Sequence, residues 1–165
     1  MDETIKISIE KLFGQKCCKK IIHSNGNLSL GFGKKIYHNN LKLDCEYFGE
    51  WEVGSYYKSW RIIQENKILL GSGDTDSNEE KKEKIDKINF DEILSIHQQT
   101  QFDVRVILKH NLIVDFLATF SENDESFHIF CPNNKFIEMD NQGVWKFGDS
   151  NKPNSRNKEN TVKGK

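Results

Sequence analysis

The segment LIVDFLATF, residues 112–120, is more apolar on both sides of an extended backbone than the segments around it. Its β-branched and aromatic residues favour a strand. A nearly continuous apolar run is typical of a strand that lies inside a sheet and is covered on both faces. We therefore expect residues 112–120 to form a central strand and to contribute much of the hydrophobic core.

Shorter segments on either side alternate between apolar and polar residues, as in LSLGF 28–32, LKLDCEY 41–47 and FDVRV 102–106. A period of two predicts strands with one face in water. Asn25-Gly26 predicts a two-residue hairpin turn, in which both positions take positive φ, and Pro132-Asn133-Asn134 predicts a second hairpin. The chain therefore reads as a series of short antiparallel strands.

One charged segment, SNEEKKEKIDK 77–87, has capping residues at its start and opposite charges at helical spacing. We expect a short helix or linker there, which divides the chain into possible halves 12–74 and 89–148. Strand-turn-strand units at 59–68 and 126–136 occupy the same place in each half. The predicted fold is mostly β, a sandwich or curved sheet, and an internally duplicated meander is one arrangement of it.

At 165 residues the chain has the length of one domain, which we place at residues 1–150. Residues 151–165 carry five basic residues and one acidic residue, a net charge of +4, so residues 1–150 hold 19 basic and 24 acidic residues, a net of −5. We expect the basic tail to be disordered. The sequence shows neither a signal peptide nor a long apolar run, which predicts a cytoplasmic protein without a membrane segment.

Few residues suggest catalysis or metal binding, and we expect no cofactor, no metal and no enzymatic activity. Two alternatives stay open: a ligand-binding sandwich, and a hydrolase whose site is built across strands from His110, Asp115 or His128. The histidines are scattered without the spacing of a metal site: His23, His38, His97, His110 and His128.

Acidic residues recur at positions expected to be turns or sheet edges, and aromatic residues accompany them in YFGEWEVGSYY 47–57. Such a cluster either keeps a sheet protein soluble or attracts a basic protein, with the aromatic rings as anchors. We interpret 47–57 as a protein-binding loop, although part of its rings could belong to the core. The candidate partner-binding residues are Asp44, Glu46, Glu50, Trp51, Glu52, Tyr56, Tyr57, Asp74, Asp76, Glu122, Asp124 and Glu125.

The order of several elements resembles small β-rich bacterial proteins that are encoded beside polymorphic, contact-dependent toxins. The elements are LSLGFG 28–33, SWRI 59–62 with ILLGSGD 68–74, a charged linker, FDVRV 102–106 with LIVDF 112–116, and GVWKFG 143–148. The resemblance implies an immunity protein: a non-enzymatic inhibitor that binds the toxin domain of its own system. The Lys-, Asn- and Ile-rich composition would suit a Gram-positive host whose wall-associated toxins deliver C-terminal nucleases.

The resemblance also implies how such a protein works. It implies a cytoplasmic protein, monomeric when free, that binds the toxin domain rather than nucleic acid or a membrane. Nucleases act on polyanions and tend to have cationic clefts, and an acidic protein can cover such a cleft.

Overall fold

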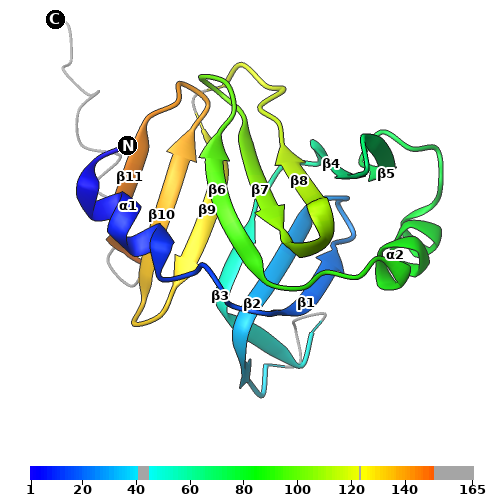
Figure 1. Cartoon of the computed structure of the whole chain (residues 1–165), viewed down its shortest axis with the longest axis horizontal. Coiled ribbons are helices and arrows are strands. Elements are labelled where there is room, and N and C mark those ends of the chain that lie inside the picture. The colour runs from blue at the N-terminus through cyan, green and yellow to red at the C-terminus, as the bar shows by residue number, and fades with distance from the viewer. Residues whose placement is uncertain (41–44, 123, 151–165) are drawn as a thin grey trace, which may run out of the picture.

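The computed structural model describes residues 1–40, 45–122 and 124–150. These residues form two antiparallel sheets and two helices (Figure 1), so the predicted β-rich fold is confirmed. The six-stranded sheet has the order β1 (Cys17–Ile22), β2 (Leu28–Tyr37), β3 (Tyr47–Gly54), β9 (Glu125–Cys131), β10 (Lys135–Asp140) and β11 (Trp145–Asp149). The five-stranded sheet has the order β5 (Lys67–Gly71), β4 (Trp60–Gln64), β8 (Leu112–Phe116), β7 (Val104–Leu108) and β6 (Ile93–Gln98).

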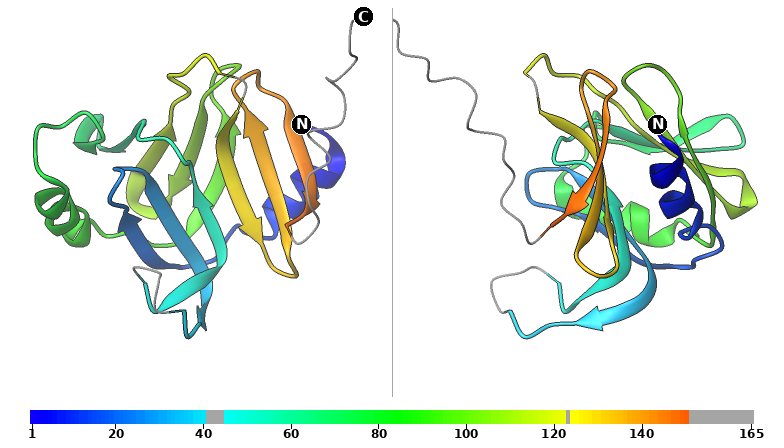
Figure 2. Two further views of the ribbon diagram at one scale, coloured as in Figure 1. Left: turned by 180° about the vertical axis from the view of Figure 1, so that it is seen from behind. Right: turned by 90° about the vertical axis from the view of Figure 1, so that its left-hand side faces the viewer.

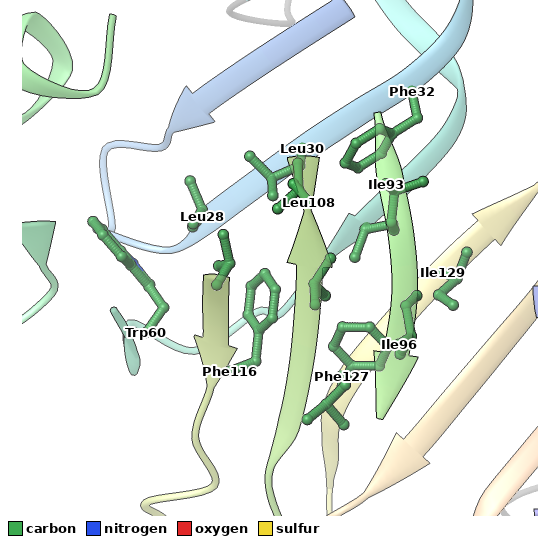
Figure 3. Close-up of a cluster of buried hydrophobic side chains, with 14 of the residues drawn as sticks. Leu28, Leu30, Phe32, Trp60, Ile93, Ile96, Leu108, Phe116, Phe127 and Ile129 are labelled. Carbon is green, nitrogen blue, oxygen red and sulfur yellow. The ribbon is translucent and has the colours of Figure 1, made fainter. Parts of the chain in front are cut away.

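The hydrophobic core lies between the two sheets (Figure 3). Leu28, Leu30 and Phe32 alternate along β2 and are fully buried, and they face residues of the other sheet such as Leu108 and Phe116. Each such side chain contributes roughly 1.5–3 kcal/mol when it leaves water. This alternation fixes the register, because a slip of one residue would turn every core side chain outward.

The predicted central strand is β8, the middle strand of the five-stranded sheet, although it ends at Phe116 rather than at Phe120. Leu112, Val114 and Phe116 point into the core. Asp115, on the opposite face, is 2% exposed because side chains of neighbouring strands cover it. The outward face of β8 at Asp115 is therefore covered by side chains of its own sheet.

The two halves of the chain share the order of their elements up to the second hairpin, and β11, which pairs with β10, has no counterpart among the described residues of the first half. In each half a helix precedes a three-stranded meander and then a hairpin, and the hairpin crosses to the other sheet. The registers agree as well: Cys17 pairs with Phe32 and Ile93 with Leu108, and a bulge follows the first residue of both β1 and β6. The order of the strands and the position of this bulge are thus similar in the two halves.

The halves are interlocked. β3 of the first half pairs with β9 of the second, and β4 of the first half pairs with β8 of the second. Since each half contributes strands to both sheets, one continuous core forms between them. In this correspondence β2, β3 and β9 of the six-stranded sheet match β7, β8 and β4 of the five-stranded sheet.

Both predicted hairpins are present, but their turns differ from expectation. Asn133 and Asn134 take positive φ, 62° and 56°, and asparagine tolerates this region better than most residues. The connection between β1 and β2 spans residues 23–27, and there Gly26 alone has positive φ. The prediction of a two-residue turn at Asn25-Gly26 was therefore wrong in length.

The helices lie at opposite ends of the molecule (Figures 1 and 2). α2 (Asn78–Lys87) confirms the predicted charged helix: Ser77 and Glu80 form a capping box at its start. At its end, Lys20 Nζ donates to the carbonyls of Ile85, Asp86 and Ile88 at 2.9–3.0 Å, which satisfies the unpaired oxygens of the last turn.

The first helix, α1 (Glu3–Glu10), was not predicted from the sequence. The local signals are present, because Asp2 caps the helix by accepting from the Ile5 amide at 2.9 Å. Ile5 and Ile9, four residues apart, are buried on one face of the helix.

Residues 47–57 do not form the predicted loop, because Tyr47–Gly54 is β3, between β2 and β9. Trp51 is 6% exposed and belongs to the core, so its assignment to a partner surface was wrong. Of the strand predicted at 41–47, Cys45 and Glu46 lie outside any strand and Tyr47 is the first residue of β3; residues 41–44 lie outside the described residues, as does the predicted disordered tail, 151–165.

Candidate functional site

The outward face of each sheet carries three neighbouring residues at equivalent positions. On the five-stranded sheet Asp115 pairs with Arg105 of β7 and with Arg61 of β4. On the six-stranded sheet the equivalent residues are Gly54, with Ser29 of β2 and His128 of β9 as its neighbours.

The residues of the five-stranded sheet form a closed ionic cluster. Arg61 Nε donates to Asp115 Oδ2 at 2.8 Å, and Arg105 donates from Nε at 2.7 Å and from Nη2 at 3.0 Å. Burial alone would raise the pKa of Asp115, but the hydrogen bonds from Arg105 and Arg61 hold it below its usual value. Both oxygens of the carboxylate are occupied, so this cluster stabilises the sheet and offers little to a ligand.

The six-stranded sheet has a cavity of about 500 Å³ at the equivalent place, which we call the sheet cavity. Gly54 lies between two residues of its wall, Ser29 and His128, and is closely packed: a Cβ atom there would lie 2.8 Å from the Leu28 carbonyl oxygen, 3.2 Å from Ser29 Oγ and 3.3 Å from His128 Nε2. The size is in the range of small-ligand sites. Its walls include Lys19, Ser29, Glu52, Tyr56, His128 and Phe130.

His128 forms one wall of the sheet cavity and is 3% exposed. Its Nδ1 lies 2.6 Å from Glu125 Oε1, and its ring lies 4.7 Å from that of Tyr56 and 4.6 Å from that of Phe130. Burial lowers the pKa of His128 to about 4, so the imidazole is neutral at pH 7. Nδ1–H then donates to Glu125, and Nε2 is left as a hydrogen-bond acceptor.

Lys19 and Glu52 form a buried ion pair in the same wall, with Lys19 Nζ 2.6 Å from Glu52 Oε1. The same oxygen accepts from the Gly49 amide at 2.5 Å. Glu52, a predicted partner-binding residue, is thus already occupied by groups of its own chain. The pair also neutralises the cationic side chain of the cavity wall.

Next to the sheet cavity, aromatic and acidic residues from both halves meet in a surface that we call the acidic edge. Tyr57 OH donates to Asp124 Oδ2 at 2.8 Å, and this hydrogen bond raises the pKa of Tyr57 to about 12. The ring of Tyr57 stacks on Phe120, with centroids 3.7 Å apart. The acidic edge comprises Tyr56, Tyr57, Phe120, Glu122 and Asp124.

Tyr56 connects the acidic edge to the sheet cavity. It is 55% exposed and also lines the cavity. Desolvation of its hydroxyl, with the negative charges of Glu125, Glu138 and Asp124, raises the pKa of Tyr56 to about 12. The field at the mouth of the cavity is therefore negative.

Five of the twelve predicted partner-binding residues converge here: Tyr56, Tyr57, Glu122, Asp124 and Glu125. Glu125 is buried beneath His128 and contributes charge rather than contact. The sequence predicted Tyr56 and Tyr57 as partner-binding residues, and it predicted the acidic residues of 122–125 as such too, but it did not predict that the two groups lie together. The role of Phe120 in joining them was not predicted, because the stacking partner lies in the other half of the chain.

Four other predicted residues lie on different elements. Asp74 accepts from the Gly71 amide at 3.0 Å, and Asp76 pairs with Lys84 of α2 at 2.6 Å. Glu46 is exposed before β3, and Glu50 is half-buried within β3. Asp44 lies outside the described residues.

The residues considered for a hydrolase do not share one site. Asp115 belongs to the ionic cluster of the five-stranded sheet, and His128 lies on the six-stranded sheet. His110, in the turn between β7 and β8, lies 3.4 Å from Asp91. The three residues therefore lie in three different environments of the described structure.

In the described part of the chain, no three or more His, Cys, Asp or Glu residues are grouped so that they could hold a metal ion. Within the same residues, neither helix has the length and apolar character needed to span a bilayer. Comparison of the chain with protein-family models, curated proteins and solved structures finds no match. Its function is therefore inferred from the geometry of the acidic edge and the sheet cavity.

Proposed function

We propose that this protein is an immunity protein, which binds a toxin domain encoded beside it, a nuclease, and neutralises it in the cytoplasm. The acidic edge is the proposed binding surface. The observation that supports the proposal best is the convergence of Tyr56 and Tyr57 with Glu122 and Asp124, residues that come from two different halves of the chain.

The chemistry of this surface suits a cationic partner. A nuclease cleft that holds a polyanion presents lysine and arginine side chains, and an acidic surface accelerates encounter with it. Residues 1–150 carry a net charge of −5, so the field of the whole body acts in the same direction. Tyrosine supplies contact area at low entropic cost and is frequent among residues that dominate binding energy.

The geometry also prepares Tyr57 for binding. Its ring is held by stacking on Phe120 and its hydroxyl by Asp124, so little side-chain freedom is lost when a partner covers it.

Co-expression with the toxin domain of the adjacent gene tests the proposal. The wild-type protein is expected to restore growth and to co-purify with the toxin domain. The double variant Tyr57→Ala, Asp124→Asn is expected to lose both effects while it stays folded. Tyr37→Ala is the matched control, because Tyr37 is 68% exposed and its ring contacts that of Tyr47, at the opposite end of β3. Absence of a complex with wild-type protein, or full rescue by the double variant, would overturn the proposal.

A further inference from the structure

We propose that the sheet cavity binds the guanidinium group of an arginine side chain from the partner protein. The inference rests on the proposed function, because it names the group that the toxin domain inserts beside the acidic edge. It is carried by three observations: the negative surroundings of the cavity, its aromatic and acceptor-bearing walls, and the equivalent cluster on the other sheet.

The first observation is the charge around the cavity. Glu138 of β10 pairs with His128 across the strands, and Glu125 holds the same imidazole. Lys19 lies in the wall, but Glu52 neutralises it at 2.6 Å. Desolvation and the negative charges of Glu125, Glu138 and Asp124 raise the pKa of Tyr56 in the cavity wall to about 12, and surroundings of this negative sign favour a cation over an anionic ligand.

The second observation is the form of the walls. Tyr56, His128 and Phe130 present neighbouring rings, with centroids 4.6–4.7 Å apart in successive pairs. A planar guanidinium stacks on such rings more favourably than a compact ammonium does. Since Nδ1–H of His128 is directed to Glu125, Nε2 can accept a hydrogen bond from a guanidinium N–H.

The third observation comes from the matching positions on the five-stranded sheet. There Arg61 and Arg105 complete the cluster around Asp115, and these are the two arginines among the described residues. At the equivalent positions of the six-stranded sheet the chain has His128 and Ser29, with Gly54 between them. Among the described residues, the face that carries Glu52 and Glu138 thus has no arginine of its own, and the sheet cavity on that face is open to one from outside.

Binding of a small probe to the isolated protein tests the inference without any toxin. L-arginine amide is titrated into the protein, and the His128 side-chain resonances are followed by NMR. L-citrulline amide serves as the isostere with an uncharged side chain, since its urea group keeps the shape of the guanidinium and loses its charge, while the α-amino group is the same in both probes. We expect saturable binding of arginine amide, and binding of citrulline amide at least about tenfold weaker.

Variants locate the binding. Tyr56→Ala is expected to weaken the binding of arginine amide at least about fivefold, whereas Tyr37→Ala is expected to leave it unchanged. Thermal unfolding of both variants verifies that they are folded. Equal binding of arginine amide and citrulline amide, or an unchanged affinity for arginine amide in Tyr56→Ala, would overturn the inference.

A second arm identifies the source of the guanidinium. Arginine amide at saturating concentration is expected to weaken the complex with the toxin domain. If arginine amide binds but does not compete, the cavity takes a free small molecule and the partner assignment is wrong. If the toxin domain is neutralised but arginine amide does not bind, the cavity inference fails and the proposed function stands. If arginine amide binds but the toxin domain is not neutralised, the proposed function fails and the cavity is a guanidinium site without that partner.

Discussion

The outward faces of the two sheets occupy equivalent places in one repeated architecture, yet they differ in chemistry. On the five-stranded sheet Asp115 is held between two arginines. On the six-stranded sheet Gly54 occupies the equivalent position, and a cavity lies beside its neighbours Ser29 and His128. Core residues of both halves are constrained by packing, whereas outward residues are not, so the same register can support a closed ionic cluster on one sheet and an open site on the other.

The largest effect is expected from the closed cluster. Asp115→Asn removes the charge that holds Arg61 and Arg105, and we expect the free energy of unfolding to fall by about 3 kcal/mol. This loss is at the lower end of the range for breaking a buried ion pair, because the side chain of Arg61 is 40% exposed and water partly screens its charge. Urea denaturation measures it. An unchanged stability would show that this cluster is not structural.

The second prediction concerns how the stability of the protein depends on pH through His128, which lines the sheet cavity. Unfolded His128 takes up a proton near pH 6.5, whereas the folded protein resists protonation down to about pH 4. Between these values the unfolded state binds more protons, so stability falls as the pH decreases, by on the order of 2 kcal/mol. Denaturation curves of wild type and His128→Gln across this window measure the effect. An equally steep decline in the variant would assign it to other groups.

A smaller effect is expected from Gly54→Ala. The added Cβ would lie 2.8 Å from the Leu28 carbonyl oxygen and would press on Ser29 and His128, which costs about 1–2 kcal/mol. It should also weaken binding of arginine amide. The control is Gly73→Ala, because a Cβ at Gly73 meets no heavy atom within 4 Å. Equal stability of both variants would contradict the close packing around Gly54.

The smallest effect tests the equivalence of the halves. Asn66 and Asn134 have φ of 62° and 56° in the matching hairpins β4–β5 and β9–β10. Glycine adopts this conformation without strain but is more flexible when unfolded. Asn66→Gly and Asn134→Gly should therefore each change stability by less than about 0.5 kcal/mol. A large effect in one turn alone, seen in thermal unfolding, would show that the hairpins are not equivalent.

The sequence predicted those strands and helices whose residues show the expected pattern within a short segment. Alternation at 28–32 and 102–106 indicated β2 and β7, and Ser77 indicated the start of α2. β3 was missed because YFGEWEVG combines glycines and carboxylates that are typical of loops. Its Glu52 is tolerated in a strand because Lys19, two strands away, neutralises it.

The sites depend on contacts that sequence order does not show. The sheet cavity requires the register of β2, β3 and β9, which places Ser29, Gly54 and His128 side by side. The acidic edge requires Phe120 under Tyr57. Both groups of residues are distant in the chain, so no local spacing could predict them.

The most direct test of the central claim, that the acidic edge binds a cationic protein, is the dissociation constant of the complex with the toxin domain as a function of salt. We predict at least about a tenfold rise in Kd between 0.05 and 0.5 M NaCl, and a higher Kd in Tyr57→Ala, Asp124→Asn than in wild type at both salt concentrations. A Kd that is independent of salt and identical in wild type and the double variant would contradict the claim.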